Sequence, residues 1–151
     1  MDQPVTQFLT SIGYIAIPLR QNAAGQLLIH ARINDVDGIY ILDSGAGQTV
    51  VDSKQLNTLK LKVNYDEAVL TGGGVGAHSL ENIPSYNNTL EIDNFKIDQV
   101  VVAVMSLETA WESLARVGVH DELFGILGVD ILKTGNAIVD FSTLTLYLKQ
   151  P

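Results

Sequence analysis

Short apolar stretches alternate with turn-forming residues over most of the chain. Val, Ile, Leu and Tyr dominate the stretches, and Gly, Asn and Asp separate them, for example at residues 22–25 and 35–38. This pattern is typical of strands joined by tight turns. The strands that it predicts cover residues 14–19, 26–34, 39–42, 67–71, 79–83, 88–92, 96–105, 123–127, 136–140 and 144–149.

Helical spacing of apolar residues is limited to a few segments. Residues 106–117 are the strongest helix candidate, because Ser106 can cap the first turn and Glu108 lies within it. The apolar stripe of this segment is better explained by packing on a sheet than by a binding site; it comprises Leu107, Ala110, Trp111 and Leu114. Two shorter helices are predicted within residues 50–59 and 130–133.

These elements predict a mostly β, barrel-like or sandwich domain with one substantial helix. The chain has 151 residues, of which 46% are hydrophobic and 17% charged, so it can bury one sizeable core. No linker or low-complexity segment divides it, and we expect a single domain over residues 1–151, with residues 1–12 as a candidate flexible extension.

Charge and composition exclude several functions. The formal net charge is −8, whereas nucleic acids and anionic membranes require a basic face, so neither is an expected partner. The chain has no cysteine, and its three histidines are far apart in sequence, so we expect no metal site. No apolar run is long enough to span a bilayer, and residues 1–3 lack the basic start of a signal peptide. The compartment stays open.

One short motif raises a chemical question. Asp43, Ser44, Gly45 and Ala46 directly follow the apolar strand at residues 39–42. An ionised carboxylate at a strand end needs water, a donor or a second carboxylate beside it. Asp43 therefore either caps a turn, which is the common case for an isolated motif, or takes part in a reaction.

Two further segments share this polar and glycine-rich character. Ile126, Leu127 and Gly128 end an apolar strand, and Asp130 follows near the start of a predicted helix. Between the two sites lies a glycine-rich stretch that consists of Gly72, Gly73, Gly74, Val75 and Gly76. Residues 36–43 and 121–128 also resemble each other, which is a weak indication of a duplicated half-domain.

Together the three segments resemble the retropepsin-like, single-domain aspartic proteases. Asp43 to Ala46 is similar to the active-site turn of that family, and residues 124–130 are similar to its second signature, which supports the active-site loop. The glycine-rich stretch is similar to the flap that covers the substrate. The resemblance implies an acid-protease barrel with a short C-terminal helix, and the helix expected at residues 106–117 is an insertion that the minimal pattern of the family lacks. It is specific because the three signatures occur in the family's order.

The implied reaction needs two carboxylates. In this family a water molecule held between two Asp side chains attacks the peptide carbonyl, and the pair shares one proton because two close carboxylates do not both ionise easily. Only Asp43 lies in an Asp-Ser/Thr-Gly motif in this chain. The resemblance therefore implies a homodimer in which each copy supplies one Asp43. Ser44 and Gly45 would set the geometry of the pair.

The glycine-rich stretch also fits a dinucleotide-binding pattern. That pattern should open a helix, but Asn82, Pro84, Asn87 and Asn88 oppose a helix after it. A hairpin lid is the better interpretation, because glycines supply hinge freedom and let the backbone approach a bound peptide.

The sequence thus predicts a homodimeric aspartic endopeptidase that acts on peptides or proteins without a cofactor. The alternative is a catalytically silent module with the same fold, which binds peptides or mediates assembly. A structural barrel with an incidental Asp-Ser-Gly is the third possibility. The inserted helix at residues 106–117 could obstruct or extend a dimer interface.

Overall fold

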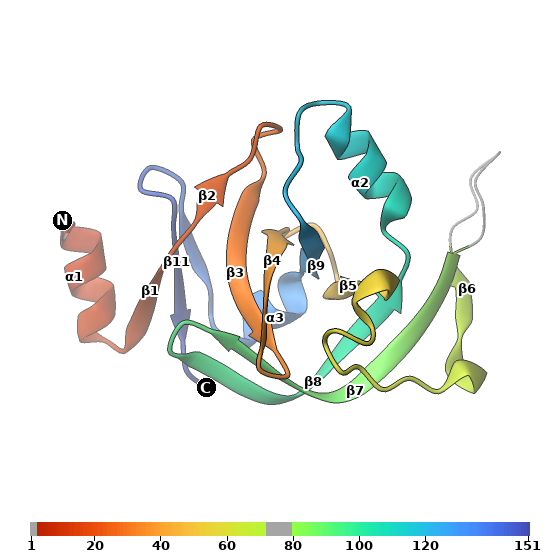
Figure 1. The fold of residues 1–151 in the computed structure, drawn as a ribbon. Coiled ribbons are helices and arrows are strands. Elements are labelled where there is room, and N and C mark those ends of the chain that lie inside the picture. Colours follow the sequence, from red (N-terminus) through yellow and green to blue (C-terminus); the bar gives the residue numbers. More distant parts are fainter. Residues whose placement is uncertain (1–2, 72–79) are drawn as a thin grey trace.

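The computed structural model describes residues 3–71 and 80–151. Strands dominate it, as predicted (Figure 1). The helices are α1 (Pro4–Ser11), α2 (Glu108–Ala115) and α3 (Val129–Thr134), with short 3-10 turns at Ser53–Gln55 and Tyr65–Glu67. The strands are β1 (Tyr14–Pro18), β2 (Arg20–Gln21), β3 (Leu27–Ile33), β4 (Val36–Leu42), β5 (Val50–Asp52), β6 (Val69–Thr71), β7 (Leu80–Ile92), β8 (Phe95–Met105), β9 (Leu123–Leu127), β10 (Ile138–Asp140) and β11 (Thr145–Lys149).

A closed circuit of strands forms the body of the molecule. The eight-stranded sheet has the order β2-β3-β4-β9-β5-β8-β7-β6, and an additional pairing of β3 with β7 closes it. The closed part is therefore a barrel that runs β3-β4-β9-β5-β8-β7. A separate three-stranded sheet has the order β1-β11-β10, and Figure 1 shows its strands β1 and β11 side by side near α1.

Two hydrophobic clusters hold these layers together. The main core fills the barrel and includes Tyr40, Phe95, Leu127 and Leu148, all fully buried. A smaller cluster lies under α2, where the half-buried Trp111 packs with Leu28, Ile41, Val119 and Leu123. The prediction that the helix after residue 106 packs on the barrel is confirmed.

The two similar stretches noted in the sequence pair directly. β4 and β9 run parallel, with Ile39 opposite Leu123 and Leu42 opposite Leu127. Parallel neighbours place the ends of both strands at the same edge of a sheet, so the segments that follow β4 and β9 meet there. This edge carries the candidate site.

Several local predictions were wrong in detail. Residues 50–52 form strand β5, not the start of a helix, because they pair with β8 on one side and β9 on the other. β7 is a single strand of 13 residues where two were expected, and Asn87 within it has a positive φ of 60°. The turn before β4 is formed by Asn34 and Asp35, so the strand begins at Val36. Helix α1 was not predicted.

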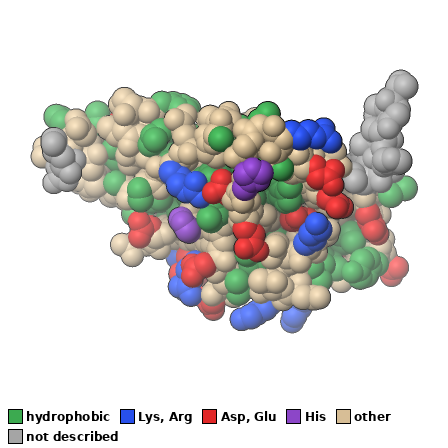
Figure 2. All heavy atoms as spheres, turned by 45° about the horizontal axis from the view of Figure 1, so that its top comes forward, with side chains coloured by type: hydrophobic (Ala, Val, Ile, Leu, Met, Phe, Trp, Pro, Cys, Tyr) green, Lys and Arg blue, Asp and Glu red, His purple; other side chains and the backbone are tan. Residues whose placement is uncertain are grey.

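None of the helices within the described residues is long and apolar enough to cross a membrane. Figure 2 shows acidic and basic side chains interspersed over the face turned forward there, without a basic patch on that face. The charge distribution on that face agrees with the acidic composition of the chain.

Candidate active site

Asp43 lies at the exposed end of β4. Its backbone amide donates to the carbonyl of Leu127 at 2.9 Å, which continues the pairing of β4 with β9 by one residue. Its side-chain oxygen Oδ1 accepts from the amide of Gly45 at 2.8 Å, and its carbonyl accepts from the amide of Ala46 at 3.2 Å. The carboxylate is thus fixed by a tight turn, and its exposure leaves it accessible to solvent.

The rest of the motif shapes the turn. A Cβ on Gly45 would lie 3.1 Å from Asp43 Oδ1, so the small residue lets the amide approach the carboxylate closely. The carbonyl of Ala46 accepts from the amide of Val129 at 2.8 Å and ties the loop to the start of α3. Ser44 is exposed beside Asp43.

The second signature lies directly against this loop. Ile126 and Leu127 are paired with Ile41 and Leu42, and the amide of Gly128 donates to Thr49 Oγ1 at 3.1 Å. A Cβ on Gly128 would come within 2.7 Å of the Ala46 carbonyl oxygen, so only glycine fits without a backbone shift.

Asp130 clamps the far end of the loop. Its Oδ2 accepts from the amide of Thr49 at 3.0 Å, and its Oδ1 accepts from the Thr49 hydroxyl at 2.8 Å. Oδ1 also accepts from the amide of Ile131 at 2.9 Å. Asp130 therefore contacts the loop that begins at Asp43. The carboxylate orders the loop by holding Thr49, and it does not reach Asp43 through any hydrogen bond among the described residues.

Sequence reasoning missed two residues that shape this site. Thr49 is only 1% exposed, and its hydroxyl links Gly128 to Asp130. Gly125 lies so close to β5 that a Cβ would be 2.1 Å from the Val50 carbonyl oxygen. The available signal for Thr49 was its place between the loop that contains Gly45 and Gly47 and the apolar residues Val50 and Val51. A polar side chain that is buried at such a place needs a hydrogen-bond partner. Gly125 lies within the second signature at residues 124–130, but its close contact with β5 depends on a strand distant in sequence.

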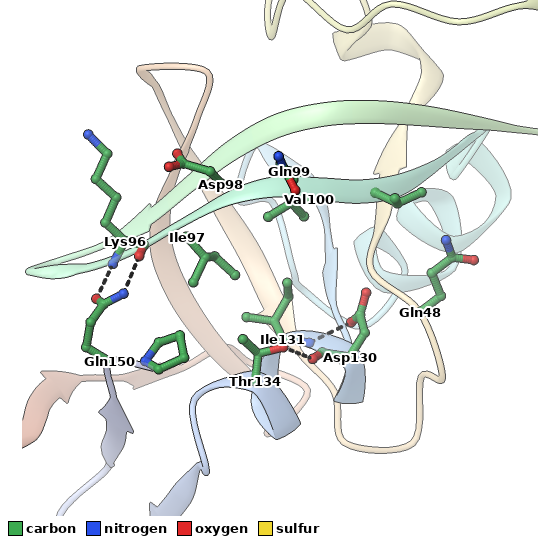
Figure 3. A pocket seen from close by; sticks show the side chains of 12 residues that line it. Gln48, Lys96, Ile97, Asp98, Gln99, Val100, Asp130, Ile131, Thr134 and Gln150 are labelled. Atoms are coloured by element: carbon green, nitrogen blue, oxygen red, sulfur yellow. Dashed lines mark hydrogen bonds between the residues drawn. The ribbon is translucent and has the colours of Figure 1, made fainter.

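Cavities lie on both sides of α3 near this loop. One of about 300 Å³ contains Asp43 and Ser44 together with Leu42 and Phe141 in its wall. A neighbouring cavity of about 520 Å³ shares Ser44, Leu132 and Val139 with it. On the other side of α3, a cavity of about 630 Å³ is lined by Gln48, Asp130 and Ile131, which Figure 3 shows pointing into it from the loop and from α3.

The remaining predicted site residues have no described position. Gly72, Gly73, Gly74, Val75 and Gly76 lie outside the described residues. Within residues 3–71 and 80–151, no group of three or more His, Asp or Glu side chains could hold a metal ion. At the described site, Asp43 presents an exposed carboxylate held in a tight turn.

Comparison with known proteins identifies the family. The family model described as "Aspartyl protease" matches residues 29–131, and the chain belongs to that family. No curated protein sequence matches the chain.

Solved structures with the same fold are retropepsin-like proteases. A retropepsin-like aspartic protease from Rickettsia conorii is 21% identical, with a TM-score of 0.60 over 91% of each chain. EIAV protease, solved in complex with the inhibitor HBY-793, is 21% identical with a TM-score of 0.54, covering 81% of this chain and 99% of its own. The retroviral protease-like domain of Ddi1 from Leishmania major is 17% identical with a TM-score of 0.56, covering 82% and 87%. The retropepsin-like fold expected from the sequence is confirmed.

Proposed function

We propose that this chain is an aspartic endopeptidase that works as a homodimer, with one Asp43 from each copy in a shared active site. The observation that carries the proposal is the position of Asp43. It is the carboxylate of the only Asp-Ser/Thr-Gly motif, it lies exposed at the end of β4, and it falls within the residues that match the aspartyl protease family.

The rigid turn suits the proposed chemistry. Two carboxylates about 3 Å apart share one proton, so that one acts as general base on a water molecule while the other acts as general acid. Such a pair repels itself and needs a scaffold that holds it in place. Here the bonds from Gly45 and to Leu127 fix Asp43, and the Asp130–Thr49 clamp fixes the loop behind it.

Ser44 and the glycine-rich segment complete the proposed site. In a dimer the exposed hydroxyl of Ser44 could bond across to the loop of the partner copy and hold the two turns together. Residues 72–76 would close over an extended peptide and pair with its backbone, as in strand addition. No cofactor enters this mechanism.

A catalytically silent binding module is the second candidate. One observation favours it: Asp43 Oδ1 already accepts a hydrogen bond from Gly45, which gives the carboxylate a structural use without catalysis. In that case the chain would keep the fold and bind peptides without cleaving them.

The substitution Asp43→Asn separates these candidates. It keeps the shape of the side chain and the acceptor for Gly45 but removes the titrating group. The proposed enzyme should lose more than about 100-fold of its rate on an unfolded protein such as reduced casein, because acid and base are both lost. Stability should stay level or rise, since the repulsion of paired carboxylates disappears.

Asp93→Asn is the matched control. Asp93 is an exposed turn residue with a φ of 54°, a conformation that Asn tolerates equally well. Its activity should equal that of the wild type. Undiminished hydrolysis in Asp43→Asn would refute the proposal, and tight peptide binding without any hydrolysis in the wild type would favour the silent module.

A further inference from the structure

The edge of β8 that faces away from β7 is only partly covered. β5 pairs with it at residues 103–105, and beside this pairing the carbonyl of Thr49 accepts from the amide of Ala103 at 3.0 Å. No described strand pairs with residues 96–101 on this side. At about 3.4 Å per residue this open stretch is roughly 17 Å long, which is enough for a short strand to add there.

A bulge in β8 frees further backbone groups on this stretch. β8 has two residues, Asp98 and Gln99, opposite the single residue Thr89 of β7, and Gln99 has a positive φ of 56°. The amide and the carbonyl of Thr89 are both bonded to Asn34, at 3.0 and 3.1 Å, on the β3 side of β7. Thr89 therefore does not pair with the bulge, and the backbone groups of Asp98 and Gln99 are left for another partner.

The chain itself places an amide on one end of this edge. The Oε1 of Gln150 accepts from the backbone amide of Lys96 at 2.9 Å, and the Nε2 of Gln150 donates to the carbonyl of Lys96 (Figure 3). A side-chain amide carries the donor and the acceptor of a peptide group, so these two bonds reproduce the pair of bonds that a neighbouring strand makes. The edge at Lys96 thus binds an amide in the manner of a strand.

The cavity of about 630 Å³ lies between this edge and α3, and Asp43 is not among its lining residues. Its volume is within the usual range for ligand sites, about 300–1,000 Å³. Ile97 and Val100 of β8 and Ile131 of α3 make part of its wall apolar, and Figure 3 shows Ile131 pointing toward β8. An added strand therefore has space here and an apolar contact for one of its side chains.

The charges on the edge define the chemistry of the partner. The ammonium of Lys96 lies 3.4 Å from a carboxylate oxygen of Glu91, whereas Asp98 forms no ion pair with any residue that the structure describes. A charged side chain on an open edge opposes accidental strand pairing, so a segment that binds here must neutralise Asp98. A lysine or arginine beside Asp98 meets this requirement.

We propose that this cavity binds an extended polypeptide segment, which adds to the β8 edge at residues 97–101 and carries a basic side chain beside Asp98. Alternate side chains of the segment face Ile97 and Ile131, and these are apolar. The inference is independent of the proposed function, because it uses neither Asp43 nor hydrolysis. It makes this side of α3 a docking site for a second polypeptide, apart from the Asp43 turn.

A designed peptide tests the docking site. The probe is a fluorescein-labelled heptapeptide of alternating valine and threonine with lysine at its centre. Fluorescence anisotropy measures its binding to the Asp43→Asn protein, so that the probe stays intact. Thr134→Trp fills the cavity from α3 and should weaken binding at least about 10-fold. Lys133→Trp, next to it on α3 but outside the cavity lining, is the matched control and should stay within about twofold. Thermal unfolding checks that both variants are folded.

Charge and backbone give two further readouts that a change in stability alone does not produce. The parent protein should prefer the lysine-centred probe to a glutamate-centred one, and Asp98→Lys should reverse this preference by at least about threefold. Two more probes carry N-methyl groups on alternate sets of residues. Because only one set faces β8, one probe should bind at least about 10-fold more weakly, and the other should bind as the unmethylated probe does.

Failure of this inference is distinct from failure of the enzyme. Binding that survives Thr134→Trp, or that both N-methylated probes lose equally, would overturn the added strand. So would a charge preference that Asp98→Lys leaves unchanged, or no binding of either probe at about 1 mM. If Thr134→Trp instead abolished self-association of the chain, a second copy would cover this edge and the inference would be wrong. None of these results bears on hydrolysis by the wild type.

Discussion

The loop at residues 43–49 and the inserted helix α2 are each held by an Asp carboxylate, half-buried at the loop and buried at the helix, yet they are held to very different degrees. At the loop, Asp130 accepts hydrogen bonds from Thr49. Backbone hydrogen bonds from Asp43 to Leu127 and from Val129 to Ala46 restrain the same loop, residues 43–49. At the helix, Asp52 accepts from Trp111 Nε1 at 2.8 Å and from the amide of Leu107 at 3.3 Å.

The difference lies in the number of independent restraints. Close glycine contacts and a parallel strand pair fix the loop from below, whereas α2 has no fully buried residue and touches the barrel mainly through Trp111 and Leu114. Removing one restraint should therefore disturb the loop together with the barrel, but should release the helix alone. The effect of removing a carboxylate that holds a segment therefore depends on how tightly that segment is packed against the rest of the fold.

The largest effect should come from the glycine contact beneath the loop. In Gly125→Ala the new Cβ would lie 2.1 Å from the Val50 carbonyl oxygen, in the middle of a β5–β9 pairing. We expect a loss of about 3 kcal/mol or more in the free energy of unfolding, because backbone must move to relieve the overlap. Urea denaturation followed by circular dichroism measures it.

Gly47→Ala is the control within the same loop. A Cβ at Gly47 meets nothing within 4 Å, and its φ is not positive. Its stability should match or slightly exceed that of the wild type. Equal losses in both variants would mean that the loop tolerates no side chain for reasons other than this contact.

The next effect should come from the loop clamp. Asp130→Ala leaves the amide and the hydroxyl of Thr49, which is buried, without their acceptors. Unsatisfied buried donors cost about 1–3 kcal/mol each, so we expect a loss of roughly 2–4 kcal/mol in unfolding free energy. Asp130→Asn retains one acceptor and should lose less.

Hydrogen exchange shows whether the clamp acts through the whole barrel. In Asp130→Ala the amides of Gly128 and Val129, which bond to the loop, should exchange faster together with those of β9. Faster exchange confined to Thr49 would contradict the idea that loop and barrel open as one unit.

A smaller and more local effect is expected at the helix. Trp111→Phe keeps an aromatic ring against the small cluster but removes the donor to Asp52, a carboxylate that is only 2% exposed. We expect a loss of about 1–2 kcal/mol, since the two remaining amide donors are long at 3.3 and 3.4 Å. Amides of α2 should exchange much faster, while those of β9 stay protected; equal changes in both would refute the contrast.

The features that the sequence predicts lie within short segments of the chain, whereas those it misses depend on contacts between distant segments. Asp43 to Ala46, Gly128 and Asp130 are predicted as site residues because they lie in short motifs that resemble the family's signatures and occur in the family's order, and the structure brings these motifs together. The strand pattern also predicted the class of fold, because alternation of apolar residues is a local signal.

The missed features depend on contacts distant in sequence. Gly125 looks like any strand glycine until β5 lies against it, and Asp52 binds Trp111 across 59 residues. Residues 50–52 form a strand only because β8 and β9 lie on either side of them. α1 lacks a side-chain N-cap and exposes most of its residues, so neither a capping residue nor an apolar stripe predicted this helix from the sequence.

Asp140 extends the comparison to a carboxylate in a surface turn after β10, and the smallest effect is expected there. Its Oδ1 accepts from the hydroxyl of Ser142 at 2.7 Å and from the amide of Ser142 at 2.9 Å, and the hydroxyl bond is the main reason that its pKa lies below the ordinary value. A lowered pKa means that the charged form stabilises the fold. That contribution is complete above the pKa of the unfolded chain and is lost as the pH falls through the folded pKa.

Asp140→Ala should therefore lower the melting temperature slightly at pH 7, by less than Trp111→Phe does, and the gap to wild type should close as the pH falls through the lowered pKa of Asp140 in the folded chain. Because the group is solvent-exposed, water competes for its bonds and the shift should be small. Melting curves at low protein concentration separate the contribution of this turn from any self-association of the chain. If the difference in melting temperature between wild type and Asp140→Ala widens as the pH falls, the expected sign of the pH dependence is wrong. A loss of stability as large as that of Trp111→Phe would show that burial does not explain why the hydrogen bonds of Asp52 stabilise the fold more than those of Asp140.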